Sequence, residues 1–337
     1  MSLPESARVY SAAQIERIRR FPTKKKIVFP EGNDPRILEG AGRLAAEGLV
    51  APLLIGTPPA GAPAGLTFID PAASPLARKY AALCFERRRA KGITQMEAAE
   101  IAARPLWFAA LMVTAGDADA MVGSAVFTTA ETVRAGLQCI DMRPGFRRLS
   151  SVHIMAVQDR RYGHDGLLAF SDAAIQIEPA PTELAEIAIA TAHTARAVFN
   201  AEPIVALLSF STKGSARHPL ADKIVEALRY IRHRAPDLHV DGELQADAAL
   251  VPAVGQSKAP GSTVAGRANV LIFPDLNSAN IGYKLVERLG SGALLAVLFQ
   301  GLAKPVNIVS RGCSAEDVYT TAIITAVQAA GASSGAP

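Results

Sequence analysis

The sequence predicts an α/β protein with largely parallel sheets, on three observations. Short apolar runs of strand length alternate with amphipathic stretches of helix length along most of the 337 residues. Hydrophobic residues make up 50% of the chain, which is enough to fill cores and excludes a disordered protein. The length is about twice that of the commonest domain, so one large or two medium domains are expected.

The predicted strands are short and bounded by turn residues. KIVF at 26–29 is the first, and a helix over 35–47 separates it from a second strand at 52–55. Further strands are predicted at 120–122, 204–210, 268–273 and 306–309, and the apolar run 293–299 also has strand length. Helices are predicted at 77–91, 182–198, 221–234, 280–289 and 315–330. Because ligands of such folds bind beyond the carboxyl ends of the strands, a site is expected at the strand-to-helix junctions.

The charge balance points to an anionic partner without naming it. Lys and Arg number 35 against 31 Asp and Glu, a net charge of +4, which suits nucleic acid, an acidic membrane surface or a phosphorylated small molecule. Residues 1–26 hold seven of the basic and two of the acidic residues, so the rest of the chain has a balance of −1. We expect this N-terminal arm to be solvated or packed on the first domain. Nucleic acid is disfavoured because no binding module or set of interleaved aromatic residues is present.

The sequence lacks the patterns typical of membrane proteins, secreted proteins and metal-binding proteins. No apolar run approaches the roughly 18–20 residues that span a bilayer, and the N-terminus has no apolar signal core. The three cysteines form no C-x-x-C pair, so a reducing cytoplasm is expected. The histidines show no ligand spacing, so nothing in the residues argues for a metal, although a metal enzyme is not excluded.

The last strand-to-helix junction, KPVNIVSRGCSAED at 304–317, is the most informative segment. Free backbone N–H groups at a helix start suit a phosphate, and the planar fork of Arg311 matches phosphate oxygens. Ser310 and Cys313 add a hydroxyl and a thiol. Ser314 and Asp317 also fit a capping box, a purely structural device, and the residues alone leave the two interpretations of Asp317 equally weighted.

Other polar junctions carry weaker signals. GSAVFTTAETVR at 123–134 places Thr128, Thr129 and Arg134 after an apolar strand, where they could hold an anion, although a Thr-capped helix with a solvated arginine is slightly favoured. The basic run that includes Arg88 is typical of a solvated helix face. The loop around Lys213 resembles a phosphate loop but lacks the P-loop spacing.

Five segments together resemble the phosphate acetyltransferases. They are IVFPEGNDPR at 27–36, LSFSTKGS at 208–215, DGELQADA at 241–248, ANVLIFPD at 268–275 and the 304–317 junction, and the resemblance runs in order from about residue 25 to 330. It implies reversible acetyl transfer between acetyl phosphate and coenzyme A, without a metal or a resident cofactor, by a homodimer. It also implies two α/β/α domains around an active-site cleft, one formed by residues 1–145 plus 297–337 and the other by 146–296.

The resemblance also assigns roles to individual residues. Ser310 and Arg311 match the catalytic Ser–Arg pair, and Asp317 matches the carboxylate base. Arg134 matches a further arginine, and we expect CoA sulfur to attack acetyl phosphate directly while the arginines clamp the phosphate. An aspartate with a pKa of about 3.9 is a weak base for a thiol of about 8.5. Burial could raise the aspartate pKa, proton transfer could accompany C–S bond formation, or the arginines could acidify the thiol, and we expect the last to contribute. The expected substrate contacts are Arg88, Thr128, Thr129, Lys213, Asn280 and Lys284.

Three alternatives remain at this stage. Cys313 as a nucleophile that forms an acyl-enzyme is disfavoured, because the family mechanism does not use it so. Phe127 and Gln176 stand where the family usually has polar His and Asn, and Ala279 and Ala303 also depart from its pattern. These changes leave phosphate butyryltransferase, or another short acyl chain, as an alternative. A non-catalytic regulatory module, like the domain appended to some malic enzymes, is disfavoured because the Ser–Arg pair and Asp317 are intact.

Overall fold

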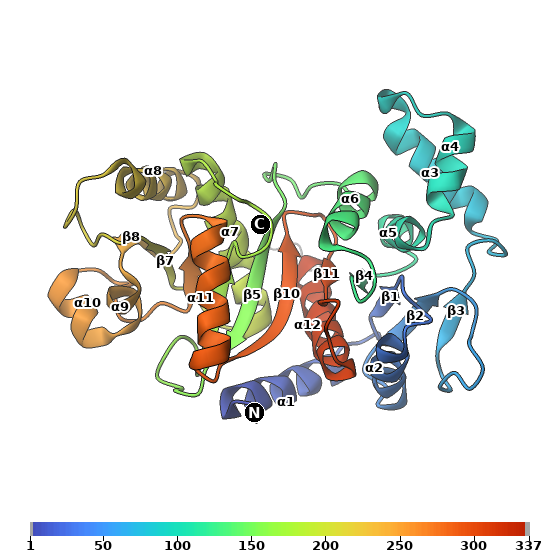
Figure 1. Cartoon of the computed structure of the whole chain (residues 1–337), viewed down its shortest axis with the longest axis horizontal. Coiled ribbons are helices and arrows are strands. Elements are labelled where there is room, and N and C mark those ends of the chain that lie inside the picture. Colours follow the sequence, from blue (N-terminus) through green and yellow to red (C-terminus); the bar gives the residue numbers. More distant parts are fainter. Residues whose placement is uncertain (1–2, 334–337) are drawn as a thin grey trace. The chain divides into compact units, whose positions relative to one another are not determined.

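The computed structural model describes residues 3–333, which group into two compact units (Figure 1). The first unit contains Ala12–Arg147 and the chain from Leu302 onward, and the second contains the chain up to Ser11 and Arg148–Gly301. Each unit combines strands with covering helices, so the predicted α/β class is confirmed.

The first unit is built on a parallel sheet. Its strand order is β3 (Thr67–Ile69), β2 (Ala51–Ile55), β1 (Lys26–Phe29), β4 (Ala120–Gly123) and β11 (Val306–Ile308). All four neighbouring pairs in this series are parallel. The carboxyl ends of β1, β4 and β11 therefore lie at one edge of the sheet, and the loops that follow these strands are neighbours.

Two helices cover one face of this sheet. The core on that face joins Ile27 and Phe29 of β1 to α2 (Pro35–Ala46) and to Val318 of α12 (Ala315–Ser333). The two helices approach closely at Gly40, where an added Cβ would lie 2.9 Å from the carbonyl oxygen of Ala315. The start of α12 is therefore held tightly against α2.

The opposite face is covered by α5 (Pro105–Ala115), which contacts β1, β2 and β4. Side chains alternate across a strand, so Val28 is buried on this face while its neighbours face α2 and α12. Almost every residue of α5 is buried, which explains its apolar composition on all sides. The remaining helices of this unit are α3 (Ala77–Arg88), a 3₁₀ turn (Arg89–Lys91), α4 (Gln95–Ala102) and α6 (Thr129–Cys139).

The second unit contains a mixed sheet. Its order is β10 (Ala293–Gln300), β5 (Ser150–Ala156), β6 (Leu167–Ser171), β9 (Val270–Ile272), β7 (Val205–Leu208) and β8 (Val240–Leu244). The pairs β10–β5 and β5–β6 are antiparallel, and the rest are parallel. Its helices are α7 (Pro181–Phe199), α8 (Pro219–Arg234), α9 (Ala246–Leu250), α10 (Pro252–Lys258) and α11 (Leu276–Leu289).

The N-terminal arm differs from the expectation. Residues 5–19 form helix α1 (Glu5–Arg19) rather than a solvated segment. Its first part packs within the second unit, where the Tyr10 hydroxyl donates to the carbonyl of Val198 at 3.2 Å and the Tyr10 ring meets Phe199 edge-on. The expectation of a solvated arm, or one packed on the first domain, is therefore wrong for residues up to Ser11.

The unit boundaries also differ from the expected 145/146 and 296/297. They fall at 147/148 and 301/302. The second difference has a clear cause, because β10 continues to Gln300 and pairs with β5 along its length, from Ala293 opposite Ala156 to Gln300 opposite Ser150. Residues 297–301 thus belong with the second unit.

Within residues 3–333 no single helix is long and apolar enough to cross a membrane. The helices α4 and α5 reach that length and composition only together, across a bend of 98°.

Candidate active site

The turn after β11 presents the predicted Ser–Arg pair to solvent. Ser310 and Arg311 are both exposed, and a hydrogen bond of 3.0 Å from the N–H of Cys313 to the carbonyl of Ser310 closes the turn. Among the described residues nothing forms a hydrogen bond or an ion pair with the Arg311 guanidinium. An exposed hydroxyl and an exposed guanidinium with no bonded partner in the described chain are thus carried by consecutive residues, shortly before the N-terminus of α12.

Asp317 forms the capping box that its spacing predicted. Its Oδ2 accepts hydrogen bonds from the backbone N–H and the hydroxyl of Ser314, at 2.8 and 2.9 Å, while its own N–H donates to Ser314 Oγ at 3.2 Å. The residue is nevertheless exposed, and its Oδ1 has no partner among residues 3–333. The structural role is observed, and it leaves one carboxylate oxygen accessible to a proton donor.

The loop after β4 begins α6 in a similar way. Thr128 is the N-cap, and its hydroxyl accepts from the N–H of Glu131 at 3.2 Å and donates to that carboxylate at 2.8 Å. The Thr128 side chain is thus occupied within the helix cap, and Thr129 is the first helical residue. Arg134 lies further along α6, exposed, and its guanidinium has no bonded partner in the described chain.

The structure distinguishes the three adjacent arginines at the end of α3. Arg87 makes a bidentate ion pair with Asp141, with distances of 2.5 and 3.0 Å. Arg89 pairs with Glu86 at 3.3 Å. The guanidinium of Arg88 is half-buried and has no bonded partner within residues 3–333, and its Nε is fully buried. Arg88 is therefore the member of this run whose charge is available to a substrate.

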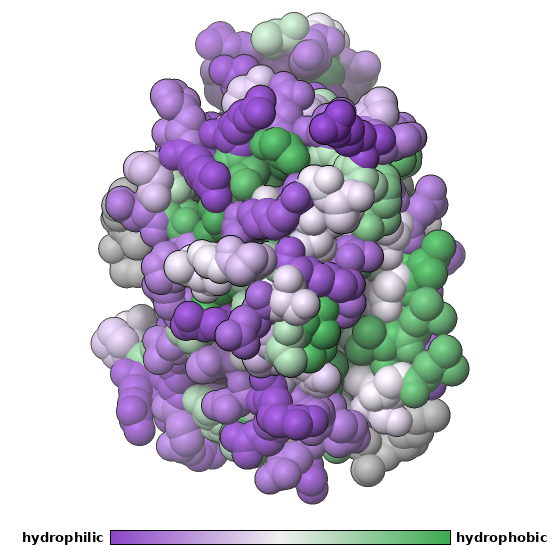
Figure 2. All heavy atoms as spheres, turned by 90° about the vertical axis from the view of Figure 1, so that its left-hand side faces the viewer, coloured by the Kyte–Doolittle hydropathy of each residue, from purple (hydrophilic) through white to green (hydrophobic). Residues whose placement is uncertain are grey.

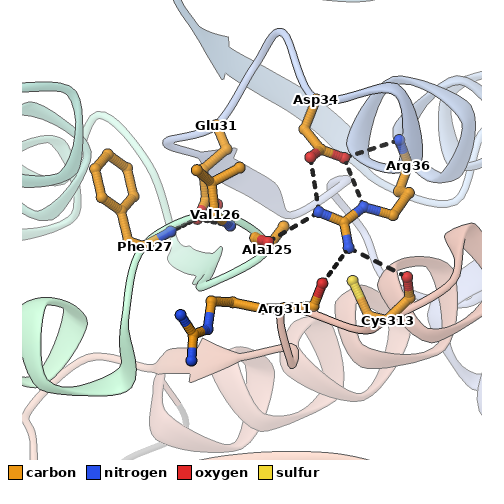
Figure 3. Close-up of polar contacts among 8 residues, drawn as sticks. All are labelled: Glu31, Asp34, Arg36, Ala125, Val126, Phe127, Arg311 and Cys313. Atoms are coloured by element: carbon orange, nitrogen blue, oxygen red, sulfur yellow. Dashed lines mark hydrogen bonds and ion pairs between the residues drawn. The ribbon is translucent and has the colours of Figure 1, made fainter.

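Arg36 connects three segments of the first unit, a role that the residue pattern did not predict (Figure 3). Its guanidinium makes a bidentate pair with Asp34, at 2.9 and 2.8 Å. It also donates to the carbonyls of Ala125 at 2.8 Å, Arg311 at 2.6 Å and Cys313 at 3.4 Å. Asp34 is the N-cap of α2, and the Arg36 hydrogen bond holds the pKa of this carboxyl below its usual range. The only sequence feature that pointed to Arg36 was its position within the IVFPEGNDPR segment, which resembles the family.

Glu31 forms hydrogen bonds with the backbone of the loop that follows β4. Its Oε1 accepts from the backbone N–H groups of Val126 at 3.0 Å and Phe127 at 3.1 Å (Figure 3). The side chain is buried, its Oε2 has no hydrogen-bond partner within residues 3–333, and desolvation raises the pKa of the carboxyl. The residue pattern did not predict a role for Glu31 either.

The remaining predicted contacts lie in the second unit. Lys213 Nζ pairs with Asp241 at 2.5 Å and donates to the carbonyl of Gly242 at 2.9 Å, so its charge is largely neutralised. Asn280 on α11 donates to the carbonyl of Ala173 at 3.3 Å. The ammonium of Lys284 lies 4.8 Å from the centre of the Tyr283 ring. Their role as substrate contacts stays a prediction.

Cys313 has little access to solvent. Its side chain is buried, and desolvation raises the pKa of the thiol despite the nearby charge of Arg36. A thiol that is hard to ionise is a weak nucleophile, which argues against an acyl-enzyme at this position. Within residues 3–333 no group of three His, Cys, Asp or Glu side chains is arranged to hold a metal ion.

Residues 11–326 match the phosphate acetyl/butaryl transferase family. The chain belongs to this family. The phosphate acetyltransferase of Thermoanaerobacterium thermosaccharolyticum is 45% identical over 313 residues, which cover 91% of this chain and 95% of that protein. The phosphate acetyltransferase of Bacillus subtilis is 43% identical over 313 residues, covering 90% and 94%. The predicted family and the predicted enzyme class, an acyltransferase, are confirmed.

The fold of a solved relative agrees closely. A phosphotransacetylase from Streptococcus pyogenes is 42% identical and superposes with a TM-score of 0.89, over 98% of this chain and 99% of that one. A branched-chain phosphotransacylase from Enterococcus faecalis, 18% identical with a TM-score of 0.68, shares the fold.

Proposed function

We propose that this enzyme transfers an acetyl group reversibly between acetyl phosphate and coenzyme A. The family and the names of relatives that are 40–45% identical support this activity. One structural observation supports it further: the Arg311 guanidinium is exposed, has no bonded partner within residues 3–333, and follows the exposed Ser310 shortly before the N-terminus of α12. This arrangement suits a phosphate-bearing substrate.

The chemistry is a direct acyl transfer. The CoA thiolate attacks the carbonyl carbon of acetyl phosphate, so that a C–S bond forms while the C–O bond to phosphate breaks, and inorganic phosphate leaves. Arg311 and Arg134 bind the phosphate and stabilise its growing charge, while the Ser310 hydroxyl hydrogen-bonds the thiol or the carbonyl oxygen. Coenzyme A is a substrate in this scheme, and the proposal includes no metal and no resident cofactor.

In the proposed mechanism the thiol proton passes to Asp317 through its open Oδ1. A carboxylate is in general a much weaker base than a thiolate, so Asp317 alone is a weak base for a thiol. The guanidinium groups compensate for this weakness, because nearby positive charge favours the thiolate. Lys213, Asn280 and Lys284 are proposed contacts of CoA.

Formation of acetyl-CoA from acetyl phosphate and CoA, followed by thioester absorbance, tests the proposal. Arg311→Ala is expected to lose about 100- to 1,000-fold in turnover, as when a group that stabilises transition-state charge is removed. The matched control is Arg89→Ala, since Arg89 is exposed and already paired with Glu86. A wild type that is inactive with acetyl, propionyl and butyryl phosphate would contradict the function.

Butyryl transfer is the second candidate function, and the apolar residue Phe127 after β4 supports it. The backbone N–H of Phe127 donates to Glu31, and this apolar residue lies two positions before α6, the helix that carries Arg134. Comparison of kcat/KM for acetyl, propionyl and butyryl phosphate decides between the two. We expect acetyl phosphate to be preferred, and a preference of tenfold or more for butyryl phosphate would reverse the assignment.

We also propose that the enzyme acts in the cytoplasm as a homodimer. All three cysteines are buried and free, as expected for a reducing compartment. On α11 three apolar side chains at a spacing of four residues are exposed, namely Ile281, Leu285 and Leu289. Figure 2 shows a largely hydrophilic face with hydrophobic residues grouped toward its right-hand edge and in smaller groups in its upper and central parts. Sedimentation equilibrium tests the assembly, and a monomer at micromolar concentration would contradict it.

A further inference from the structure

Arg36 is bonded to the backbone of the turn that carries Arg311 and to the backbone of the loop that precedes α6, the helix that carries Arg134. Its guanidinium donates hydrogen bonds to the carbonyls of Arg311 and Cys313, which lie in the 310–313 turn after β11. It also donates to the carbonyl of Ala125, in the 124–127 loop after β4. Asp34 orients the same guanidinium through two further hydrogen bonds (Figure 3). One planar group thus sets the spacing between the turn that carries Arg311 and the loop that leads to Arg134.

The donor count separates Arg36 from the arginines proposed to bind phosphate. A guanidinium has five N–H groups, and Arg36 makes five hydrogen bonds to protein atoms. It has no donor left for a substrate, whereas Arg311 and Arg134 have no bonded partner among the described residues. The geometry therefore fits a group that acts on the loops and not on the phosphate.

The 124–127 loop is restrained from a second direction. Glu31 accepts hydrogen bonds from the N–H groups of Val126 and Phe127, while Arg36 donates a hydrogen bond to the carbonyl of Ala125. Consecutive peptide groups of the loop are thus fixed by side chains from the segment that joins β1 to α2. Flexible motion of this loop would change the start of α6 and, with it, the position of Arg134.

We propose that Arg36, oriented by Asp34, is a positioning residue that fixes the 310–313 turn to the 124–127 loop and thereby places Arg311 and Arg134 for acyl transfer. The inference rests on the proposed function of this site. Because displacement of a reacting group by about 1 Å can cost about 100-fold in rate, the loss of these backbone bonds should act on turnover.

Arg43 provides a matched control on the same helix. It also joins α2 to α12, through an ion pair of 2.5 Å with Glu316 and a stack over the Tyr319 ring, but it bonds neither loop of the site. Arg43→Met therefore reproduces any general loosening between the two helices. Arg36→Met removes the loop contacts as well, and Arg36→Lys keeps the charge but cannot span Asp34 and three carbonyls at once.

The experiment measures kcat, the KM for acetyl phosphate and for CoA, and the melting temperature of all four proteins. We expect Arg36→Met to lower kcat by about 30- to 100-fold, with the KM for CoA within about twofold of wild type. Arg36→Lys should stay at least about tenfold below wild type in kcat with a melting temperature close to it. Arg43→Met should retain wild-type kcat within about twofold.

Two results would overturn the inference. One is a wild-type kcat in Arg36→Lys, and the other is an equal loss of kcat in Arg36→Met and Arg43→Met. If Arg36→Met does not fold, the comparison of Arg36→Lys with Arg43→Met still decides the question. An inactive wild type instead counts against the proposed function itself, so the two failures are distinguishable.

Discussion

Asp317 accepts two hydrogen bonds from Ser314 through a single carboxylate oxygen, Oδ2. The other oxygen of the same exposed side chain has no partner within residues 3–333. One aspartate thus begins helix α12 and also offers a proton acceptor at the proposed site. The two roles use different atoms, so substitutions can separate them.

Asp317→Asn should preserve the cap and remove the base. The amide oxygen can still accept from Ser314, so the melting temperature should change little, whereas kcat should fall by about 100-fold or more because an amide does not take up a proton. Ser314→Ala should do the reverse, with a loss of about 1 kcal/mol in the free energy of unfolding and a smaller change in kcat. Steady-state kinetics and thermal unfolding of both variants check this. Near-normal turnover in Asp317→Asn would remove the base role.

The sequence predicted those parts of the protein that depend on local pattern. The strand KIVF at β1 and the junction at 304–317 are visible because apolar periodicity and capping residues act over a few positions. The antiparallel pairs of β5 with β10 and β6 depend on contacts between distant segments and leave no comparable trace. The all-apolar helix α5 was also missed, because it has no polar face to give a helical period.

The same distinction applies to the candidate site. Ser310, Arg311 and Asp317 are close in sequence, so their grouping could be predicted. Arg36 acts on carbonyl groups 89 and 275 residues away, and backbone acceptors have no sequence signature. The choice among three adjacent arginines likewise needed the partners of Arg87 and Arg89, which only the fold reveals.

The arginines at the end of α3 should differ sharply in their effect on catalysis. Arg88→Ala should raise the KM for acetyl phosphate or lower kcat, with a combined loss of about tenfold or more in kcat/KM, because an unpaired charge is removed. Arg89→Ala should remain within about twofold of wild type, since exposed ion pairs such as that with Glu86 contribute little. Steady-state kinetics at constant ionic strength check both. Equal effects of the two substitutions on kcat/KM would show that the arginines at 87–89 form only a solvated helix surface.

His153 should make the second unit sensitive to mild acid. The side chain is buried beside Tyr283, and desolvation, with a smaller effect of the Lys284 charge, lowers its pKa from 6.5 to about 3. A lowered histidine pKa adds stability above the unfolded value that is lost as pH falls below it. Between pH 7 and 5 the loss should be about 2 kcal/mol in the free energy of unfolding. Denaturant unfolding at both pH values should show a clearly smaller loss for His153→Gln, and equal losses would contradict the assignment.

Glu31 should have the opposite dependence on pH. Burial raises the pKa of its carboxyl above the value of 4.5 for an exposed glutamate. For a raised carboxyl pKa, the stabilising contribution is present below the unfolded pKa and is lost as pH rises through the folded value. Glu31→Gln does not titrate, and its amide oxygen can still accept from the N–H groups of Val126 and Phe127. The stability of Glu31→Gln relative to wild type should therefore increase as pH rises from about 4 to 8.

The measurement is the free energy of unfolding of both proteins across that pH range. The slope of the difference is the quantity to examine, because the new amide donors shift its absolute value by a constant amount. Glu39→Gln, an exposed substitution on α2, controls for the loss of one negative charge. A difference for Glu31→Gln that falls with pH, or that follows the Glu39→Gln control, would mean that the Glu31 carboxyl is not destabilised by its burial beneath the 124–127 loop.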